Sequence, residues 1–128
     1  MPRWKNYSKV DFEYYESLNL HLSSDGFVDI NSPESKNFKT QYFYKFGELP
    51  TDDAYYGYDM MLYFGRMIDK YGTQFQKNID GEPFEGLHTR FEFLPVGAAN
   101  IENPDDQYQS NQHVTIIKFK DFYFQKAE

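Results

Sequence analysis

The chain of 128 residues contains no cysteine. This absence excludes disulfide bonds, thiol catalysis and cysteine metal sites, but it leaves the compartment open because disulfide-free proteins occur on both sides of a membrane. Basic residues are also scarce: 13 Lys and Arg stand against 20 Asp and Glu, which gives a net charge of −7. We therefore expect no binding to nucleic acid and no attraction to anionic membranes, since both require clustered cations.

Known catalytic motifs are missing as well. No phosphate-binding or dinucleotide-binding glycine loop occurs, and no serine lies in a G-x-S-x-G turn. His21, His88 and His113 lie far apart in the sequence and lack the spacing of metal ligands. Residues 1–4 lead directly into polar sequence without the apolar segment of a signal peptide, so the chain as given would stay in the cytoplasm. We expect no enzyme, no metal and no cofactor.

Aromatic residues are present in excess. The chain has 12 Tyr, 13 Phe and 1 Trp, which together make up 20% of it. Rings bury large areas and offer faces for stacking, so they form either the core or an exposed surface for sugars, amino acids or a protein partner. The length suits a single domain over residues 1–128, with a core of its own.

The strongest helical signal covers residues 51–72. Thr51 suits the N-cap position, Asp52 and Asp53 complement the helix dipole in the first turn, and Gly72 suits a left-handed residue after the last turn. Charged residues within the segment argue against a membrane span. One apolar stripe at helical spacing is predicted to face the core, and it consists of Ala54, Tyr58, Met61, Leu62, Gly65 and Ile68.

Asp59 is the only charged residue between Ala54 and Gly65. A carboxylate buried on an apolar helix needs a partner, so we favour a structural hydrogen bond or ion pair over contact with a ligand or a tolerated surface charge. Paired carboxylates at positions 52–53 and 105–106 leave a small hydrolase as a minor alternative, which requires the fold to bring two carboxylates together.

A short amphipathic helix is predicted over residues 10–18, with Ser8 as its N-cap and Asn19 at its end. Two explanations fit the segment that follows. Residues 20–22 and 27–30 are either the two strands of a hairpin or parts of an extended crossing segment. The sequence favours neither.

A second helix is predicted between Ser32, as the capping residue, and Gly47, with Pro33 at its first position. Three rings repeat along it at four-residue spacing: Phe38, Tyr42 and Phe46. The connection to the helix at 51–72 is short, so the two helices should be antiparallel neighbours or cross steeply.

The C-terminal part is predicted to be mostly strand. One or two helical turns follow Gly72, and residues 86–94 then alternate as a half-buried strand does. Residues 95–112 are predicted to be a loop, and the last strand covers 114–120 and extends to Phe124. We expect the two strands to pair as an antiparallel ribbon. Helices in the middle and strands toward the end indicate an α+β fold.

Three segments of the chain, in this order, carry a resemblance to a known family. They are Met1-Pro2-Arg3-Trp4 before a helix; Phe38-x3-Tyr42-x2-Lys45-x-Gly47-x2-Pro50 running into Asp53-Ala54-Tyr55-Tyr56-Gly57-Tyr58-Asp59; and Gly86-Leu87-x-Thr89-Arg90-Phe91-x-Phe93. Together they resemble the C-terminal part of type I periplasmic binding proteins. Among these, the chain is similar to the branched-chain amino-acid receptor-like proteins of the Bacteroidetes cell envelope, which include substrate-binding components of ABC transporters.

The resemblance implies part of an α/β fold with two Rossmann-like lobes, joined by crossing strands around a ligand cleft. Residues 1–22 would belong to the second lobe and 23–31 to a crossing. Helices over 32–71 would pack on the first lobe, and the final strands would return to the second. The parallel sheet of the first lobe would precede Met1. We expect the aromatic helices to be covered by self-association instead, most simply as a symmetric dimer.

The resemblance further implies a non-enzymatic solute-binding module, or a remnant of one, in a cell-envelope transport or sensing system. Its ligand would be an amino acid or a cell-wall fragment, and its location the periplasm if a longer precursor exists. Trp4, Ser24, Tyr55 and Tyr56 are the candidate ligand contacts, with core packing or capping as the alternative for each. A second hypothesis is a structural, self-associating module that binds no small ligand.

Overall fold

The computed structural model describes residues 11–96 and 108–127. In chain order its elements are α1 (Phe12–Ser17), β1 (His21–Ser24), α2 (Pro33–Phe46), α3 (Asp52–Tyr71), the 3-10 helix η2 (Gly72–Gly81), β2 (Phe84–Glu85), β3 (Arg90–Phe91), β4 (Phe93–Val96), β5 (Tyr108–Asn111), β6 (Thr115–Lys120) and β7 (Tyr123–Lys126). The mixture of helices and antiparallel strands confirms the predicted α+β class.

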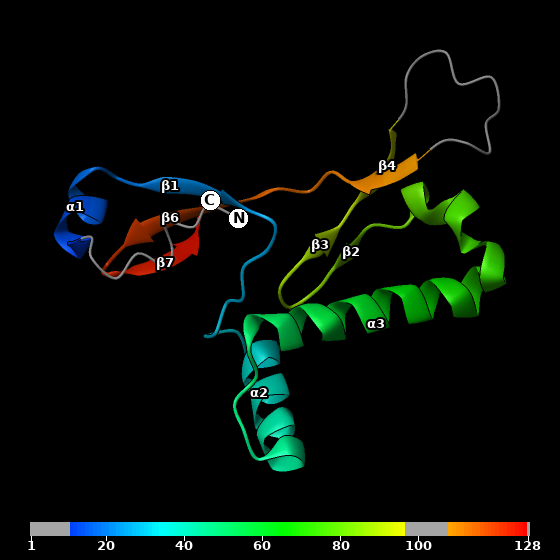
Figure 1. Ribbon diagram of the computed structural model, residues 1–128, viewed down its shortest axis with the longest axis horizontal. Coiled ribbons are helices and arrows are strands. Elements are labelled where there is room, and N and C mark those ends of the chain that lie inside the picture. Colours follow the sequence, from blue (N-terminus) through cyan, green and yellow to red (C-terminus); the bar gives the residue numbers. More distant parts are fainter. Residues whose placement is uncertain (1–10, 97–107, 128) are drawn as a thin grey trace.

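The elements form two lobes along the long axis of the molecule (Figure 1). The first lobe is an antiparallel sheet of order β1-β6-β7 with α1 at one end, and the second holds α2, α3, η2 and the two ribbons β2–β3 and β4–β5. The chain passes from the first lobe to the second through residues 25–32 and returns through residues 112–114. The first lobe is therefore built from two segments that are distant in the sequence, whereas the second lobe is formed by consecutive elements from α2 to β5.

The ends of α2 and α3 lie where the sequence predicts them. The hydroxyl of Ser32 accepts a hydrogen bond from Ser35 N (3.1 Å), and that of Thr51 accepts one from Ala54 N (3.3 Å). Gly47 ends α2 in the left-handed conformation. Gly72 has a positive φ of 68° but a ψ of −159°, so it lies outside the left-handed helical region that was predicted. Figure 1 shows α2 crossing α3 steeply, so the antiparallel alternative is wrong.

The face of α3 that packs into the second lobe is not the predicted stripe. Four residues at four-residue spacing are buried instead: Tyr55, Asp59, Tyr63 and Met67. Of the predicted stripe, Met61 is 77% exposed and Ile68 is 50% exposed. The predicted stripe rests on apolar periodicity alone. The face that α3 turns inward is instead the one on which the Asp59 carboxylate and the Tyr63 ring find partners in the β2–β3 ribbon and η2.

The core of the second lobe is a stack of rings. Tyr63 lies parallel to Phe91 (4.8 Å between centroids) and to Phe93 (5.8 Å), and its hydroxyl donates a hydrogen bond to Ile79 O (3.4 Å). Offset-stacked rings contribute about 0.5–1.5 kcal/mol beyond their buried area. Further residues close the cluster: Met60, Phe64, Met67, Tyr71, Phe75 and Phe84.

The first lobe has a smaller core under its sheet. β6 alternates buried and outward residues, and its Phe119 meets Tyr15 of α1 edge to face (5.4 Å). The prediction that the last strand runs on to Phe124 is wrong. Asp121 and Phe122 both have positive φ (56° and 66°), so the chain reverses there and β7 pairs back onto β6. Two successive positive φ values are typical of a tight hairpin turn.

The predicted ribbon of residues 86–94 with 114–120 is also wrong. Residues 86–89 form the turn between β2 and β3, β4 pairs with β5, and β6 pairs with β1 and β7. Strand β5 also replaces part of the loop predicted over 95–112, of which residues 97–107 lie outside the described part of the chain.

The structure corrects the predicted N-cap of α1 and decides between the two alternatives for residues 20–30. Helix α1 begins after Asp11, which accepts a hydrogen bond from Glu13 N (3.1 Å); the predicted cap Ser8 lies outside the described residues. Asn19 follows the helix with a positive φ, as a terminating residue does. Between β1 and α2 the chain forms the extended crossing, so the hairpin alternative is wrong.

Burial of Tyr63 gives the first testable prediction. Burial, together with the charge of Glu82, raises the pKa of Tyr63 to about 12 from 10.0. The folded state therefore holds this proton more tightly than the unfolded state does. The contribution of Tyr63 to the free energy of unfolding is fully present below pH 10 and is lost as the pH rises toward 12. Two units correspond to roughly 2–3 kcal/mol. Denaturant unfolding of Tyr63→Phe should lose less stability than wild type between pH 9 and 11.5, and equal losses would contradict the assignment.

Candidate functional site

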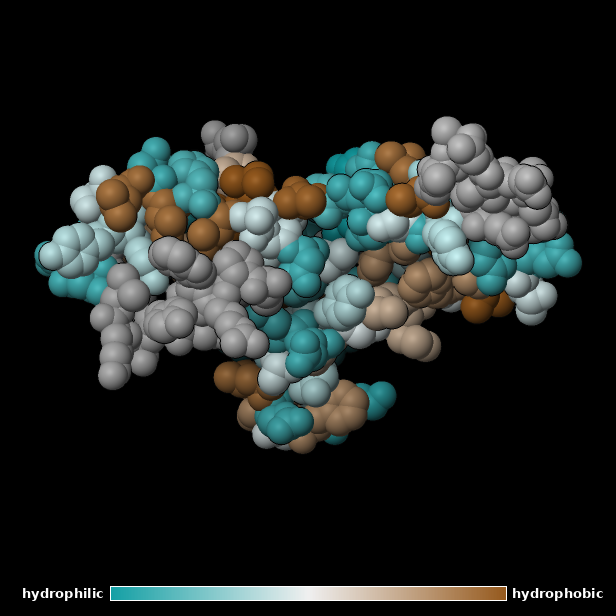
Figure 2. Space-filling model, turned by 45° about the horizontal axis from the view of Figure 1, so that its top comes forward, coloured by the Kyte–Doolittle hydropathy of each residue, from teal (hydrophilic) through white to brown (hydrophobic). Residues whose placement is uncertain are grey.

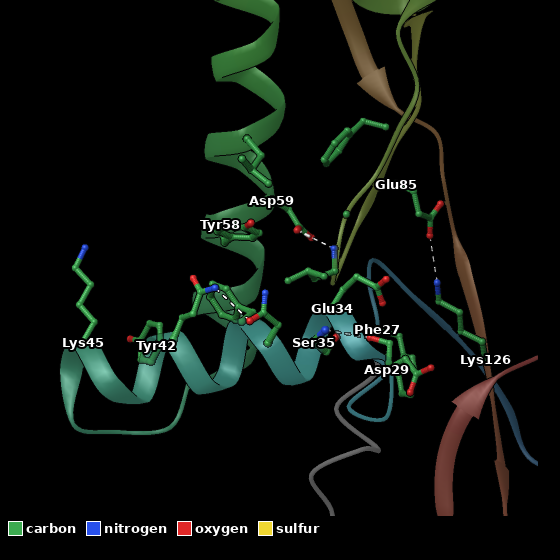
Figure 3. Close-up of a pocket in the computed structure, with 18 of the residues that line it drawn as sticks. Phe27, Asp29, Glu34, Ser35, Tyr42, Lys45, Tyr58, Asp59, Glu85 and Lys126 are labelled. Atoms are coloured by element: carbon green, nitrogen blue, oxygen red, sulfur yellow. Dashed lines mark hydrogen bonds and ion pairs between the residues drawn. The ribbon is translucent and has the colours of Figure 1, made fainter.

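A broad concave surface lies where α2, α3, the β2–β3 turn and the first crossing meet (Figure 3). Its cavity volume is about 760 Å³, which is within the range of sites for small molecules. Figure 3 shows Tyr42 and Lys45 of α2 and Tyr58 of α3 on one side, with Glu85 and Lys126 on the other. Both lobes contribute, since Lys126 belongs to β7.

Rings form the apolar part of this cavity. Phe38 of α2 lies 4.7 Å from Tyr58 and 4.7 Å from Tyr55, and 5.8 Å from Tyr42 of its own helix, measured between ring centroids. Tyr42 continues the row to Phe46 at 4.6 Å. The predicted repeat of rings along α2 is thus the cavity wall, and the rings offer flat apolar faces to a bound molecule.

Polar side chains lie around the rings and could fix the orientation of a ligand. Gln41 donates to Asn37 (3.2 Å), so an amide pair lies at the middle of α2. Carboxylates of Asp29 and Glu34 line the same cavity near the crossing. Together these groups can accept and donate hydrogen bonds beside stacking faces, which suits a small polar molecule with hydroxyl, amide or ammonium groups.

Asp59 holds one wall of the cavity in place. Its side chain is fully buried, and its carboxylate accepts three backbone hydrogen bonds: from Leu87 N (2.8 Å), His88 N (2.7 Å) and Thr89 N (2.9 Å). Hydrogen bonds to an ionised acceptor are short and strong, and they satisfy a charge that would otherwise be costly to bury. The structure therefore confirms the predicted structural hydrogen-bonding role of Asp59.

The β2–β3 turn also makes contact with the crossing segment. Phe27 N donates to His88 O (2.8 Å), and the His88 ring lies against Gly26 so closely that a Cβ there would be 2.3 Å from it. A Cβ on Gly86 would likewise be 2.3 Å from the Asp59 carboxyl group. Both positions therefore require glycine, since real Cβ atoms do not approach other atoms this closely.

The two lobes share one further contact across the cavity. Lys126 Nζ lies 3.3 Å from Glu85 Oε1, and Arg90 approaches the other oxygen of Glu85 at 3.7 Å. All three side chains are substantially exposed, and exposed ion pairs contribute about 0–1 kcal/mol. The hydrogen-bonded turn, and not this ion pair, therefore positions the second lobe against the crossing.

Resolved pKa shifts among the other groups have structural causes outside the cavity. Hydrogen bonds from Lys70 and Tyr71 lower the pKa of Glu82, and the bond to Glu82 raises the pKa of Lys70. Burial, with a contribution from Asp52, raises the pKa of Tyr55. None of these groups lines the cavity. These shifts therefore belong to the packing of α3 and η2 and not to the cavity.

The structure separates the candidate contacts named from the sequence. Tyr55 is buried against Phe38, and Ser24 is buried with its hydroxyl donating to Gly26 O (2.7 Å). Tyr56 is partly exposed and lies 5.6 Å from the His88 ring, and Trp4 lies outside the described residues. Tyr55, Tyr56 and Ser24 do not line the concave cavity. Their role in ligand contact remains a prediction.

The sequence did not identify the residues that line the cavity as parts of one site. Tyr42, Tyr58 and Gln41 were assigned to helices, but nothing marked them as neighbours of Asp29 or Lys126. The repeated rings along α2 were the one available signal. Within residues 11–96 and 108–127, no three His, Asp or Glu side chains are grouped closely enough to hold a metal ion.

Comparisons with protein-family models, with curated proteins and with solved structures found no match. No helix in the described part of the chain has both the length and the apolar character needed to cross a membrane.

The Asp59 interaction gives the second prediction. Asp59→Asn keeps the shape but removes the charge and turns an amide N–H₂ toward backbone donors, so stability should fall by about 2–4 kcal/mol. Denaturant unfolding measures this loss, and hydrogen exchange should show weaker protection of the amides of Leu87, His88 and Thr89. Asp69→Asn on the exposed part of the same helix is the control, with a change within about 0.5 kcal/mol. Equal effects of the two variants would refute the role of Asp59.

Proposed function

We propose that this chain is a non-enzymatic solute-binding module on the plan of a two-lobed binding protein from a cell-envelope transport or sensing system. The observation that supports this most is the path of the chain. Residues 11–24 lie in one lobe, the crossing at 25–32 leads to the other, and the crossing at 112–114 leads back. The resemblance to type I periplasmic binding proteins implies this alternation, with a ligand held between lobes.

The concave cavity is the proposed binding surface. Its wall of rings with neighbouring amides and carboxylates suits an amino acid or a cell-wall fragment, because both present polar groups beside an apolar face. Specific recognition by such a site depends on a few well-placed polar groups over an apolar wall. The chemistry required by this proposal is binding alone.

The third prediction tests this surface by ligand-induced thermal stabilisation. Wild-type protein is screened against amino acids and soluble muropeptides, and a ligand at 100 times its Kd should stabilise the folded state by about 2.7 kcal/mol. Tyr42→Ala removes a ring from the cavity wall and should abolish the shift. Tyr44→Ala is the matched control, because Tyr44 is 84% exposed on the same helix and does not line the cavity. The absence of a shift with every compound would count against the proposal.

A second candidate function, a self-associating structural module, is supported by a different observation. Large apolar side chains remain exposed on α2, on α3 and in the connection between them, among them Phe43, Leu49, Met61 and Ile68. Figure 2 shows apolar side chains at the surface of the projecting α2 and on the neighbouring lobe. Contiguous exposed apolar surface is typical of protein interfaces.

The fourth prediction therefore concerns mass in solution. Light scattering at micromolar concentration should give twice the 15.3 kDa of one chain, with the mass falling toward that of one chain on dilution. A constant mass of one chain across the concentration range would contradict self-association.

A further inference from the structure

The outward side of α3 has a regular arrangement that the buried side does not explain. Ala54, Tyr58, Met61, Gly65 and Ile68 follow one another at intervals of four, three, four and three residues. This spacing places them in one line along the helix, opposite the buried residues Asp59 and Tyr63. An apolar repeat of 3.5 residues is the pattern by which one helix packs along another.

This line of residues, the α3 seam, is accessible. Met61 is 77% exposed, Ile68 is 50% exposed, and a Cβ placed on Gly65 would meet nothing within 4 Å. Tyr58 touches Phe38 of α2 on one flank and is 40% exposed. At about 1.5 Å per residue the seam extends over roughly 20 Å, which is enough to seat several turns of a second helix.

The sizes of the seam residues fit a second copy of the same seam in the opposite direction. If two α3 helices pair antiparallel about Met61, Tyr58 of one copy faces Gly65 of the other, and Ala54 faces Ile68. Tyr58 and Ile68 then each meet a small residue, and Met61 meets Met61 on the two-fold axis. Parallel pairing would place Tyr58 against Tyr58 and leave Gly65 against Gly65, with a clash and a void. Interdigitation of large and small residues is what close helix packing requires.

The charges of α3 favour the same direction. Its first turn carries Asp52 and Asp53, whereas its last two turns carry Arg66, Asp69 and Lys70, with one net positive charge. Antiparallel pairing brings the acidic end of one helix beside the basic end of the other and opposes the two helix dipoles. Parallel pairing would set the two acidic turns together, which is unfavourable.

We propose that two copies of this chain associate through the α3 seams, paired antiparallel about a two-fold axis at Met61. The proposal rests on the self-association put forward as the second candidate function and specifies its interface. The occupant of the seam is a second copy because size and charge along α3 are complementary to α3 itself. A symmetric pair of this kind is isologous, so the same residues of both copies are buried.

The fifth prediction uses the absence of cysteine from the chain, which makes every engineered disulfide unambiguous. Met61→Cys places two thiols face to face on the axis, so mild oxidation should convert most of the protein to a covalent dimer on non-reducing gels. Tyr44→Cys is the control: its residue is more exposed, at 84%, but lies on α2 outside the seam, and it should stay largely monomeric on the gel.

The direction of pairing has its own test. A mixture of Ala54→Cys and Ile68→Cys proteins should form a mixed disulfide, whereas each variant alone should form none, because in the antiparallel pair like positions lie about 20 Å apart. Disulfides within each variant alone, and none in the mixture, would show parallel pairing and overturn the proposal.

Two further variants separate this interface from self-association in general. Met61→Glu should convert the dimer to a monomer by light scattering at unchanged circular dichroism, and Met61→Leu should leave it dimeric. A monomeric wild type would overturn both the interface and self-association, and would leave the seam for another part of a longer chain or another partner. A wild-type dimer that Met61→Cys does not cross-link and Met61→Glu does not dissociate would overturn this interface alone.

Discussion

The carboxylate of Asp59 is the interaction on which the arrangement of the second lobe depends. It lies in the middle of α3 and accepts hydrogen bonds from three successive backbone N–H groups of a turn 28–30 residues later in the chain. The same turn also accepts a hydrogen bond from Phe27 N of the crossing segment, at His88 O. One buried charge therefore links the long helix, the ribbon and the crossing segment. Exposed ion pairs, such as that of Glu85 with Lys126, contribute much less.

The same interaction explains why α3 buries one apolar face and exposes another. The helix carries more apolar residues than one face can hold, so hydrophobicity alone does not decide its rotation about its axis. A buried unpaired carboxylate would cost several kcal/mol, so the helix turns Asp59 toward the three backbone donors of the β2–β3 turn. Tyr55, Tyr63 and Met67 follow Asp59 inward, and Met61 and Ile68 are left facing outward.

Features set by neighbouring residues could be predicted from the sequence, and features set by distant ones could not. The caps Ser32 and Thr51 and the end of α2 at Gly47 follow from local hydrogen bonding and backbone preference. The rotation of α3 and the pairing of β6 depend on partners far along the chain, and the turn at 121–122 lacks the glycine or asparagine that would announce it. Asp59 was recognised as needing a partner, but its partners are backbone groups, which carry no signature in the sequence. The cavity was missed because its lining side chains come from segments that are far apart in the sequence.

The proposed binding surface and the proposed interface lie on adjoining sides of α3. Tyr58 and Leu62 line the cavity, and Tyr58 also belongs to the seam. In an antiparallel pair the two-fold axis is perpendicular to both helices, so the side that carries Tyr58 and Leu62 meets the same side of the partner. Two cavities would then open toward one common face of the dimer. A short ligand gains little from this arrangement, whereas a polymeric cell-wall fragment could occupy both cavities and bind more tightly through the higher effective concentration of the second site.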